Sequence, residues 1–383
     1  MLSPRQCTPA TSGAKLRELY LARSVGEWGQ LFLAGFADER AGEPRCADLQ
    51  FCRDFRYVPK PPSYRPSQVI RGVVGKWPLP ILNYTSPALV EAAEGMAREL
   101  DFDLIQLESI HMLRCERALR ARGVRAPVVY NWHNIESELM FRYAETVRSP
   151  ARRIYASLTA RKLRRMEGEI LGDALGHVVC SQRESEMLSR IAPKARIAVI
   201  ENGVDCDAFA PDEPVCEAVP RSIVFVGSMD YFPNAEGAVW FAREIWPKVR
   251  ERLPHLEFVI VGARPTPAVL ALREVPGVAV TGTVDSVKPY YRSALAAVVP
   301  LKTGGGTRLK ILEAMAAGSP VVSTPLGAEG LAIQPDMDYL PAGGDSHELW
   351  VRHLVQLASN TGLRPQLIGR GLRTVRARYD WRS

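Results

Sequence analysis

The sequence has no long hydrophobic run. Its 383 residues contain no stretch of about 18 uninterrupted apolar residues, the length that a membrane-spanning helix needs. The N-terminal segment MLSPRQCTPATSGAKLREL also lacks the apolar core of a signal peptide. We therefore expect neither a membrane span nor an export signal.

Cysteine is present without a pattern. The seven cysteines are scattered, odd in number and free of any C-x-x-C pair. This argues against a disulfide framework and against a structural zinc site. The simplest compartment is therefore a reducing cytoplasm.

Acidic residues are fewer than basic ones, 42 against 49, which gives a net charge of +7. The excess favours an anionic partner, and charge alone does not choose among nucleic acid, anionic lipid and a phosphate-bearing substrate. The 46% of hydrophobic and 24% of charged residues are typical of a globular protein. The length suits two domains of roughly 150 to 200 residues each.

Apolar strands and helices alternate along the chain. In the first half we expect strands at 30–36, 103–108, 127–134, 176–181 and 195–205, with helices at 13–30, 86–100 and 147–171. After the acidic, proline-containing segment 206–220 we expect strands at 221–228, 257–262, 278–282, 296–301 and 320–324, with helices at 234–253, 267–274, 286–294 and 307–317. The alternation predicts an α/β protein with parallel sheets and two domains, 1–205 and 206–383.

The most informative segment is AAVVPLKTGGGTRLKILEAMAAGSPVVST, residues 296–324. A buried strand runs into Gly304, Gly305 and Gly306, and a helix is expected from about Thr307. Glycines at the carboxyl end of a parallel strand let a ligand approach the backbone, and the helix start presents free N–H groups and a positive dipole end. The segment is neither a Walker A loop nor G-x-G-x-x-G. It predicts a phosphate site of another kind.

Three charged residues follow at the start of this helix. Arg308 and Lys310 lie in the first turn, where cations oppose the helix dipole unless an anion compensates them. Glu313 stands among Ile, Leu, Met and Ala, which suggests a partner such as ribose hydroxyls. The alternative is a glycine-rich turn before an ordinary helix with solvated charges.

Several segments together resemble glycosyltransferase family 4, and within it the exopolysaccharide-associated sugar transferases. They are YNWHNIESELMFRYA (130–144), VCSQRESEML (179–188), VIENGVD (199–205), VFVGSMDYFPN (224–234) and GGGTRLKILEAMAAGSPVVST (304–324). The resemblance implies a GT-B fold, with two Rossmann-like domains whose parallel sheets face each other across a cleft. It also implies a nucleotide-sugar donor in the C-terminal domain, an acceptor in the N-terminal domain, and transfer with retention of anomeric configuration.

The resemblance gives roles to the charged residues of the second domain. Glu313 corresponds to the second Glu of the E-x7-E motif of the family, which binds the nucleotide ribose, and the first Glu is replaced by Gly305. The family often places an Arg and a Lys after the first strand of this domain, where this chain has 227–230 without a cation. Arg308 and Lys310 are therefore predicted to stabilise the leaving diphosphate as catalytic residues.

In the first domain Ser12-Gly13 matches a small-residue loop of the family that lies near donor phosphate and acceptor, although no strand is recognisable before it. His133 follows one strand, and Glu108 ends the preceding one, where relatives place a catalytic His. Both are candidate catalytic residues, and their alternatives are a packing histidine and a surface carboxylate. The predicted donor-binding residues are Gly13, Gly227, Gly304, Gly305, Gly306, Thr307 and Glu313.

We expect no cofactor and no metal. The D-x-D patterns at 101–103, 205–207 and 336–338 are interpreted as chance, since Asp103 precedes its strand and Asp205 falls in a turn. The basic helix 148–165 is either a solvated face or a contact for anionic lipid or a lipid-diphosphate acceptor. Nucleic acid is not an expected partner, because no aromatic interleaving accompanies the charge.

These features predict a retaining glycosyltransferase of the cytoplasm or of the inner face of the plasma membrane. It would move a hexose-type sugar from a nucleoside-diphosphate sugar to a glycan or lipid-linked acceptor, in exopolysaccharide or cell-surface polysaccharide synthesis. Two alternatives stay open, a sugar-nucleotide epimerase on the same fold and a non-catalytic GT-B partner subunit.

Overall fold

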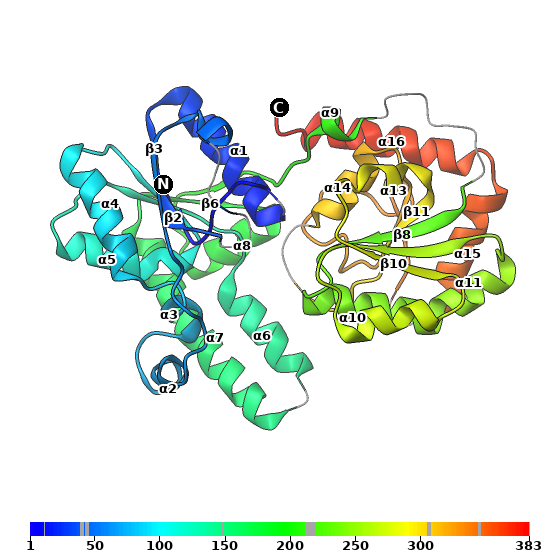
Figure 1. Cartoon of the computed structure of the whole chain (residues 1–383), viewed down its shortest axis with the longest axis horizontal. Coiled ribbons are helices and arrows are strands. Elements are labelled where there is room, and N and C mark those ends of the chain that lie inside the picture. The colour runs from blue at the N-terminus through cyan, green and yellow to red at the C-terminus, as the bar shows by residue number, and fades with distance from the viewer. Residues whose placement is uncertain are drawn as a thin grey trace. The chain divides into compact units, whose positions relative to one another are not determined.

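The computed structural model describes residues 1–10, 12–38, 42, 46–147, 149–210, 220–304, 308–343 and 346–382, with the backbone alone at 46 and 47. The chain divides into two compact units, Met1–Glu201 and Asn202–Ser383 (Figure 1). The sequence pattern places residues 202–205 in the first domain, but in the structure they group with the second. The reason is that Val204 pairs with Asp380 and donates its N–H to the carbonyl oxygen of Tyr379 at 2.7 Å.

The first unit is built on a seven-stranded sheet in which every strand pairs in parallel, in the order β3-β2-β1-β4-β5-β6-β7. The strands are β1 (Leu2–Ser3), β2 (Leu31–Phe36), β3 (Cys52–Val58), β4 (Ile105–Glu108), β5 (Val128–Asn131), β6 (Gly176–Val179) and β7 (Ile197–Val199). The chain order reverses between β1 and β4. In open parallel sheets, the carboxyl ends of the strands at such a point form the usual ligand site.

Helices connect these strands. They are α1 (Gly13–Trp28), α2 (Pro66–Val74), α3 (Leu79–Leu82), α4 (Pro87–Glu99), α5 (Leu113–Ala121), α6 (Glu136–Thr146), α7 (Pro150–Asp173) and α8 (Gln182–Ile191), with 3-10 turns at Cys46–Leu49 and Ile110–Met112. The helix predicted from Gly13 is present, and Ser12 caps it by accepting the N–H of Lys15 at 3.4 Å. Among the described helices, none is both long and apolar enough to cross a bilayer.

The expectation that no strand precedes Ser12 was wrong. Leu2 and Ser3 form β1 in the middle of the sheet, where Leu2 pairs with both Ala34 and Leu107. Two residues are too few for any periodic pattern to show.

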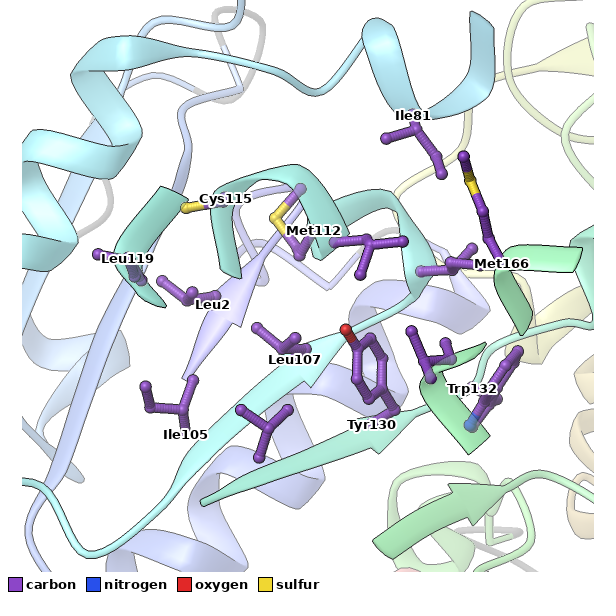
Figure 2. Close-up of a cluster of buried hydrophobic side chains, with 14 of the residues drawn as sticks. Leu2, Ile81, Ile105, Leu107, Met112, Cys115, Leu119, Tyr130, Trp132 and Met166 are labelled. Carbon is purple, nitrogen blue, oxygen red and sulfur yellow. The ribbon is translucent and has the colours of Figure 1, made fainter. Parts of the chain in front are cut away.

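The core of the first unit packs against one face of this sheet (Figure 2). Leu107 and Tyr130 from the central strands belong to the same buried cluster as Met112 and as Met166 of the long helix α7. Ile105 and Leu107 alternate with Gln106 and Glu108 along β4, so the apolar side chains of this strand share one face of the sheet.

The second unit holds a six-stranded parallel sheet in the order β10-β9-β8-β11-β12-β13. The strands are β8 (Ser222–Val226), β9 (Glu257–Val261), β10 (Val278–Gly282), β11 (Ala294–Val299), β12 (Val321–Ser323) and β13 (Leu340–Pro341). The first five confirm the predicted strands within a few residues. The chain order reverses here between β8 and β11.

The helices of this unit are α9 (Cys206–Phe209), α10 (Phe232–Trp240), α11 (Trp246–Arg252), α12 (Pro267–Leu270), α13 (Lys288–Ser293), α14 (Leu309–Ala316), α15 (His347–Ser359) and α16 (Leu363–Arg378), with a 3-10 turn at Ala271–Glu274. A π-helical turn, Phe241–Ile245, joins α10 to α11, so the helix predicted at 234–253 is one continuous element. Phe241 packs against Phe258 and Trp350, with ring centroids 4.8 and 5.2 Å away.

Two strand ends in the second sheet touch through their backbones. Gly262, just after β9, has φ +150°, and a Cβ on it would lie 1.8 Å from the carbonyl oxygen of Gly227, just after β8. Only glycine fits there. This close approach draws the carboxyl ends of β8 and β9 together.

Replacing Gly262 with alanine should therefore lower the free energy of unfolding by about 2 to 4 kcal/mol, because the methyl group must push a neighbouring backbone away. Gly282, which ends β10 with φ +78° and has open space around it, is the matched control. Gly282→Ala should cost about 1 kcal/mol, from backbone strain alone. Urea denaturation of the two variants measures both, and equal losses would contradict the contact.

Candidate functional site

A buried ammonium group occupies the carboxyl end of β8. The Nζ of Lys310, from the first turn of α14, donates to Asn234 Oδ1 at 2.8 Å and lies 4.4 Å from the centre of the Phe225 ring. A Cβ on Gly227 would lie 2.8 Å from this Nζ and 2.6 Å from Asn234 Nδ2. The absence of a side chain at Gly227 is therefore what makes room for the cation.

The surroundings disfavour the charge on Lys310. Burial and, to a smaller extent, the nearby Arg308 lower its pKa to about 7 against the opposing effect of Glu313. Arg308 itself is buried at the N-terminal cap position of α14. An anion beside these two side chains would stabilise their positive charge, and a bound diphosphate would be such an anion.

Glu313 lies on the same helix as Lys310, three residues further on. Its Oε2 accepts a hydrogen bond from the hydroxyl of Tyr291 at 3.2 Å, and burial raises its pKa against the opposing effects of Tyr291 and Lys310. A carboxylate held by a phenol at a helix start can accept hydrogen bonds from ligand hydroxyls. This geometry is compatible with the ribose contact that the sequence predicted.

The glycine-rich loop is described in part. Gly304 has φ +103°, and a Cβ on it would meet Pro233 at 3.0 Å and Arg308 Nη2 at 3.2 Å. Predicted donor residues Gly305, Gly306 and Thr307 lie outside the described residues.

Sequence reasoning missed two residues near this place. One is Asn234, which bridges Lys310 and the carbonyl oxygen of Ser228. The other is Arg264, which follows β9 and donates to Ser228 Oγ at 2.7 Å and to Asp230. The segment after Gly227 carries no cation of its own, but the parallel pairing of β8 with β9 supplies one from the next loop.

A second buried polar cluster lies at the carboxyl ends of β1, β4 and β5. Glu108 has no exposed surface, and its Oε2 is 2.9 Å from His133 Nε2 and accepts from Asn131 Nδ2 at 2.6 Å. Burial would raise the pKa of Glu108, but these hydrogen bonds, with one from Gln106, hold it below its usual value. The structure thus brings the two predicted residues Glu108 and His133 into direct contact.

Helix α1 contributes charges to this cluster from its buried face. Arg17 donates to Asn131 Oδ1 at 2.9 and 3.1 Å and to the carbonyl oxygen of Ile200 at 2.6 Å. Glu18 accepts from Ser3 Oγ at 2.7 Å, and its Oε1 lies 3.4 Å from His133 Nε2. Burial raises the pKa of Glu18 to about 8 against the attraction of Arg5. The cluster anchors the start of α1, where the predicted donor residue Gly13 is the first helical residue.

Glu18, Glu108 and His133 are close enough together to hold a metal ion, with one ligand atom of each within 4.8 Å of the others. The surroundings suit hydrogen bonding better, since Arg5 lies 3.3 Å from Glu18 and Arg17 reaches the cluster through Asn131. We interpret it as a network that positions α1.

Two all-parallel α/β units, each with its polar residues at the reversal of strand order, define the GT-B class of fold. Sucrose-phosphate synthase from Thermosynechococcus elongatus matches over 100% of this chain and 95% of that chain, with a TM-score of 0.73 at 17% identity. Anabaena HepE, solved with UDP and glucose, matches over 99% and 95%, with a TM-score of 0.71 at 14% identity.

Family models match both units. "Glycosyltransferase Family 4" matches residues 51–208, and "Glycosyl transferases group 1" matches residues 220–360. The chain thus belongs to the family 4 and group 1 glycosyltransferases, as the sequence resemblance predicted.

Curated relatives match part of the chain. A phosphatidyl-myo-inositol mannosyltransferase of Mycolicibacterium smegmatis is 31% identical over 193 residues, 48% of each chain. A 44.6 kDa protein of the Klebsiella pneumoniae cps region is 22% identical over 167 residues, 42% of each chain. The match spans about half the length of these curated relatives.

The buried Glu18 makes a testable contribution to the pH dependence of stability. Its folded pKa, about 8, lies above that of an unfolded glutamate, so the folded state holds an extra proton between those values. That stabilisation is complete at low pH and is lost as the pH rises towards 8. Glu18→Gln keeps the shape of the protonated acid and removes this loss.

The unfolding free energy of Glu18→Gln, minus that of the wild type, should therefore increase from pH 5.5 to pH 8.5, by up to about 1.4 kcal/mol per pH unit. Urea denaturation across this range measures it. Glu91→Gln, at an exposed position of α4, is the control. A difference that does not change with pH would show that Glu18 is ionised throughout.

Proposed function

We propose that this protein is a retaining glycosyltransferase that uses a nucleoside-diphosphate sugar and acts on a glycan or lipid-linked acceptor in exopolysaccharide or cell-surface polysaccharide synthesis. The observation that carries the proposal is the pair Arg308, which is buried, and Lys310, which is half-buried, at the start of α14 beside the side-chain-free Gly227. Two neighbouring cations at a helix start raise the electrostatic free energy of the folded protein, and an anionic group beside them would lower it.

The known proteins support the donor class and the setting. HepE of Anabaena has been solved with UDP and with UDP-glucose. One curated relative is a mannosyltransferase, and another comes from a cps region. We take UDP and GDP as the first nucleotides to test.

In the proposed reaction the bond between the anomeric carbon and the donor phosphate oxygen breaks. An acceptor hydroxyl oxygen bonds to that carbon, the nucleoside diphosphate leaves with the bonding electrons, and the proton of the hydroxyl passes to the departing diphosphate directly or through water. Negative charge grows on the diphosphate as this happens, so Arg308 and Lys310 would interact more strongly with the transition state than with the bound donor. Glu313 would hold the ribose.

Glu108 and His133 receive a different role in this proposal. Glu108 is fully buried and His133 nearly so, so we assign them to positioning α1 and the loop at Gly13 rather than to contact with the acceptor. The proposal also includes a cytoplasmic site of action, with the basic helix 148–165 as a contact for an anionic membrane surface.

A second candidate is a GT-B subunit that binds nucleotide without turnover. The sequence places Gly305, which lies outside the described residues, where the family motif has its first Glu. Binding of a nucleoside diphosphate, together with no consumption of any sugar donor, would favour this candidate.

Nucleotide binding tests the role of Glu313. UDP or GDP at one hundred times its dissociation constant should add about 2.7 kcal/mol to the wild-type free energy of unfolding. Glu313→Ala should abolish that gain while leaving the fold intact, because the ribose loses its carboxylate partner. Glu348→Ala, at an exposed position of α15, should bind as the wild type does. Equal calorimetric binding by Glu313→Ala and wild type would place the ribose elsewhere.

Turnover tests the cations separately from binding. Arg308→Ala should lower kcat on the order of 100-fold, as loss of a preorganised transition-state donor does, with a smaller loss of donor affinity. Arg308→Lys should recover little, since an ammonium cannot grip two phosphate oxygens at once. Arg352→Ala, exposed on α15, is the control. A raised KM with unchanged kcat would mean that Arg308 only holds the donor.

A further inference from the structure

Hydrogen bonds from one lysine hold helix α2 against the basic helix α7. The Nζ of Lys162 donates to the carbonyl oxygens of Gly72, Val73 and Gly75 at 2.9, 2.6 and 2.7 Å. A cation at these carbonyl oxygens supplies hydrogen bonds that the C-terminal end of α2 lacks, and it interacts favourably with the helix dipole. Helices α2 and α7 also contact each other directly (Figure 1).

This arrangement leaves large apolar side chains in contact with water. Val74, Ile154 and Ile70 are 79%, 63% and 62% exposed, although aliphatic residues of this size are usually buried. We call the exposed set the α2–α7 patch. It consists of Tyr64, Ile70, Val73, Val74, Ile154 and Leu158.

The patch lies among cations without any acidic residue in the two segments that form it. Between Asp54 and Glu91 the sequence has five Lys and Arg and no Asp or Glu, and between Glu145 and Glu167 it has seven and none. Exposed members of this set are Arg65, Arg71, Lys76, Arg152, Arg153, Arg161, Arg164 and Arg165. A solvated helix face would ordinarily mix both signs, as α5 does with Glu116 and Arg120.

Apolar side chains surrounded by cations suit the interface of an anionic bilayer. There the aliphatic groups reach the acyl boundary and the cations meet lipid phosphates. A nucleic acid would use the cations but would gain nothing from exposed Ile and Val. A cationic surface of this kind also repels basic partners.

We propose that the α2–α7 patch inserts into the interface of an anionic membrane, with Ile70, Val74 and Ile154 as the inserting side chains. The inference rests on the membrane contact proposed for the basic helix. It deepens that proposal, because a purely electrostatic contact would need only the cations of α7, whereas insertion also needs the apolar side chains of α2. Lys162 is excluded from lipid contact, since its ammonium group holds α2.

Flotation of the full chain with vesicles tests this. The probes are phosphatidylcholine vesicles with and without phosphatidylglycerol, at low and at physiological salt. The wild type should bind the phosphatidylglycerol vesicles and remain partly bound at physiological salt. Ile70→Ser with Val74→Ser should lower vesicle affinity at least tenfold, while Arg161→Gln with Arg164→Gln should mainly remove the response to phosphatidylglycerol.

Leu104→Ser with Leu175→Ser is the matched control, because both residues are exposed leucines of the same unit outside the patch. It should bind as the wild type does. Equal vesicle binding by wild type and Ile70→Ser with Val74→Ser would overturn insertion but keep the basic contact. No vesicle binding by the wild type at low salt would overturn both and point to a protein partner for the patch. Nucleoside-diphosphate binding, measured in parallel, should be unchanged in every variant and reports separately on the proposed transferase site.

Discussion

The second unit depends on a cation placed where a side chain on Gly227 would be. Lys310 reaches that place because β8 ends in glycine and because Asn234 accepts its hydrogen bond. Gly262 then has to be glycine as well, since its backbone packs on the carbonyl oxygen of Gly227. The start of α14 is therefore held against the strand ends by a charge that has little water around it, and Arg308 adds a second. The physical consequence is a concentration of positive charge that would favour an anion beside it, as the proposed function requires.

In the first unit the corresponding strand ends carry buried acidic side chains instead of cations. Glu108 at its strand ends and Glu18 from α1 are two buried acidic side chains, and both have partners within the chain, among them Ser3, Arg5, Asn131 and His133. The two carboxylates differ in the direction of their pKa shifts, because Glu108 accepts several hydrogen bonds while Glu18 is mainly desolvated. These contacts hold α1 against the strand ends, which suits the loop that leads into this helix.

The sequence predicted the sheets well and the contacts between loops poorly. Strands β2, β8, β9 and β11 are apolar runs between helices, so their pattern is local. Strand β1 has two residues, and its place at the centre of the sheet comes only from pairing with β2 and β4. Helix α2 follows a proline-rich loop and exposes apolar residues, so neither its start nor its face follows the usual pattern. Lys162 lies in the basic helix 148–165, but its role depends on carbonyl groups about ninety residues away in the sequence.

The residues of the candidate site also fall into two groups, those that share a local sequence pattern and those that only the fold brings together. Arg308, Lys310 and Glu313 could be predicted because they follow one another on a single helix after a glycine loop. Asn234, Tyr291 and Arg264 come from other elements, and only parallel strand pairing brings them near. The most direct measurement is a crystal structure of this chain with UDP or GDP bound. The account predicts the diphosphate against Arg308 and Lys310, and the ribose against Glu313. A nucleotide bound with its diphosphate away from the start of α14 would contradict it.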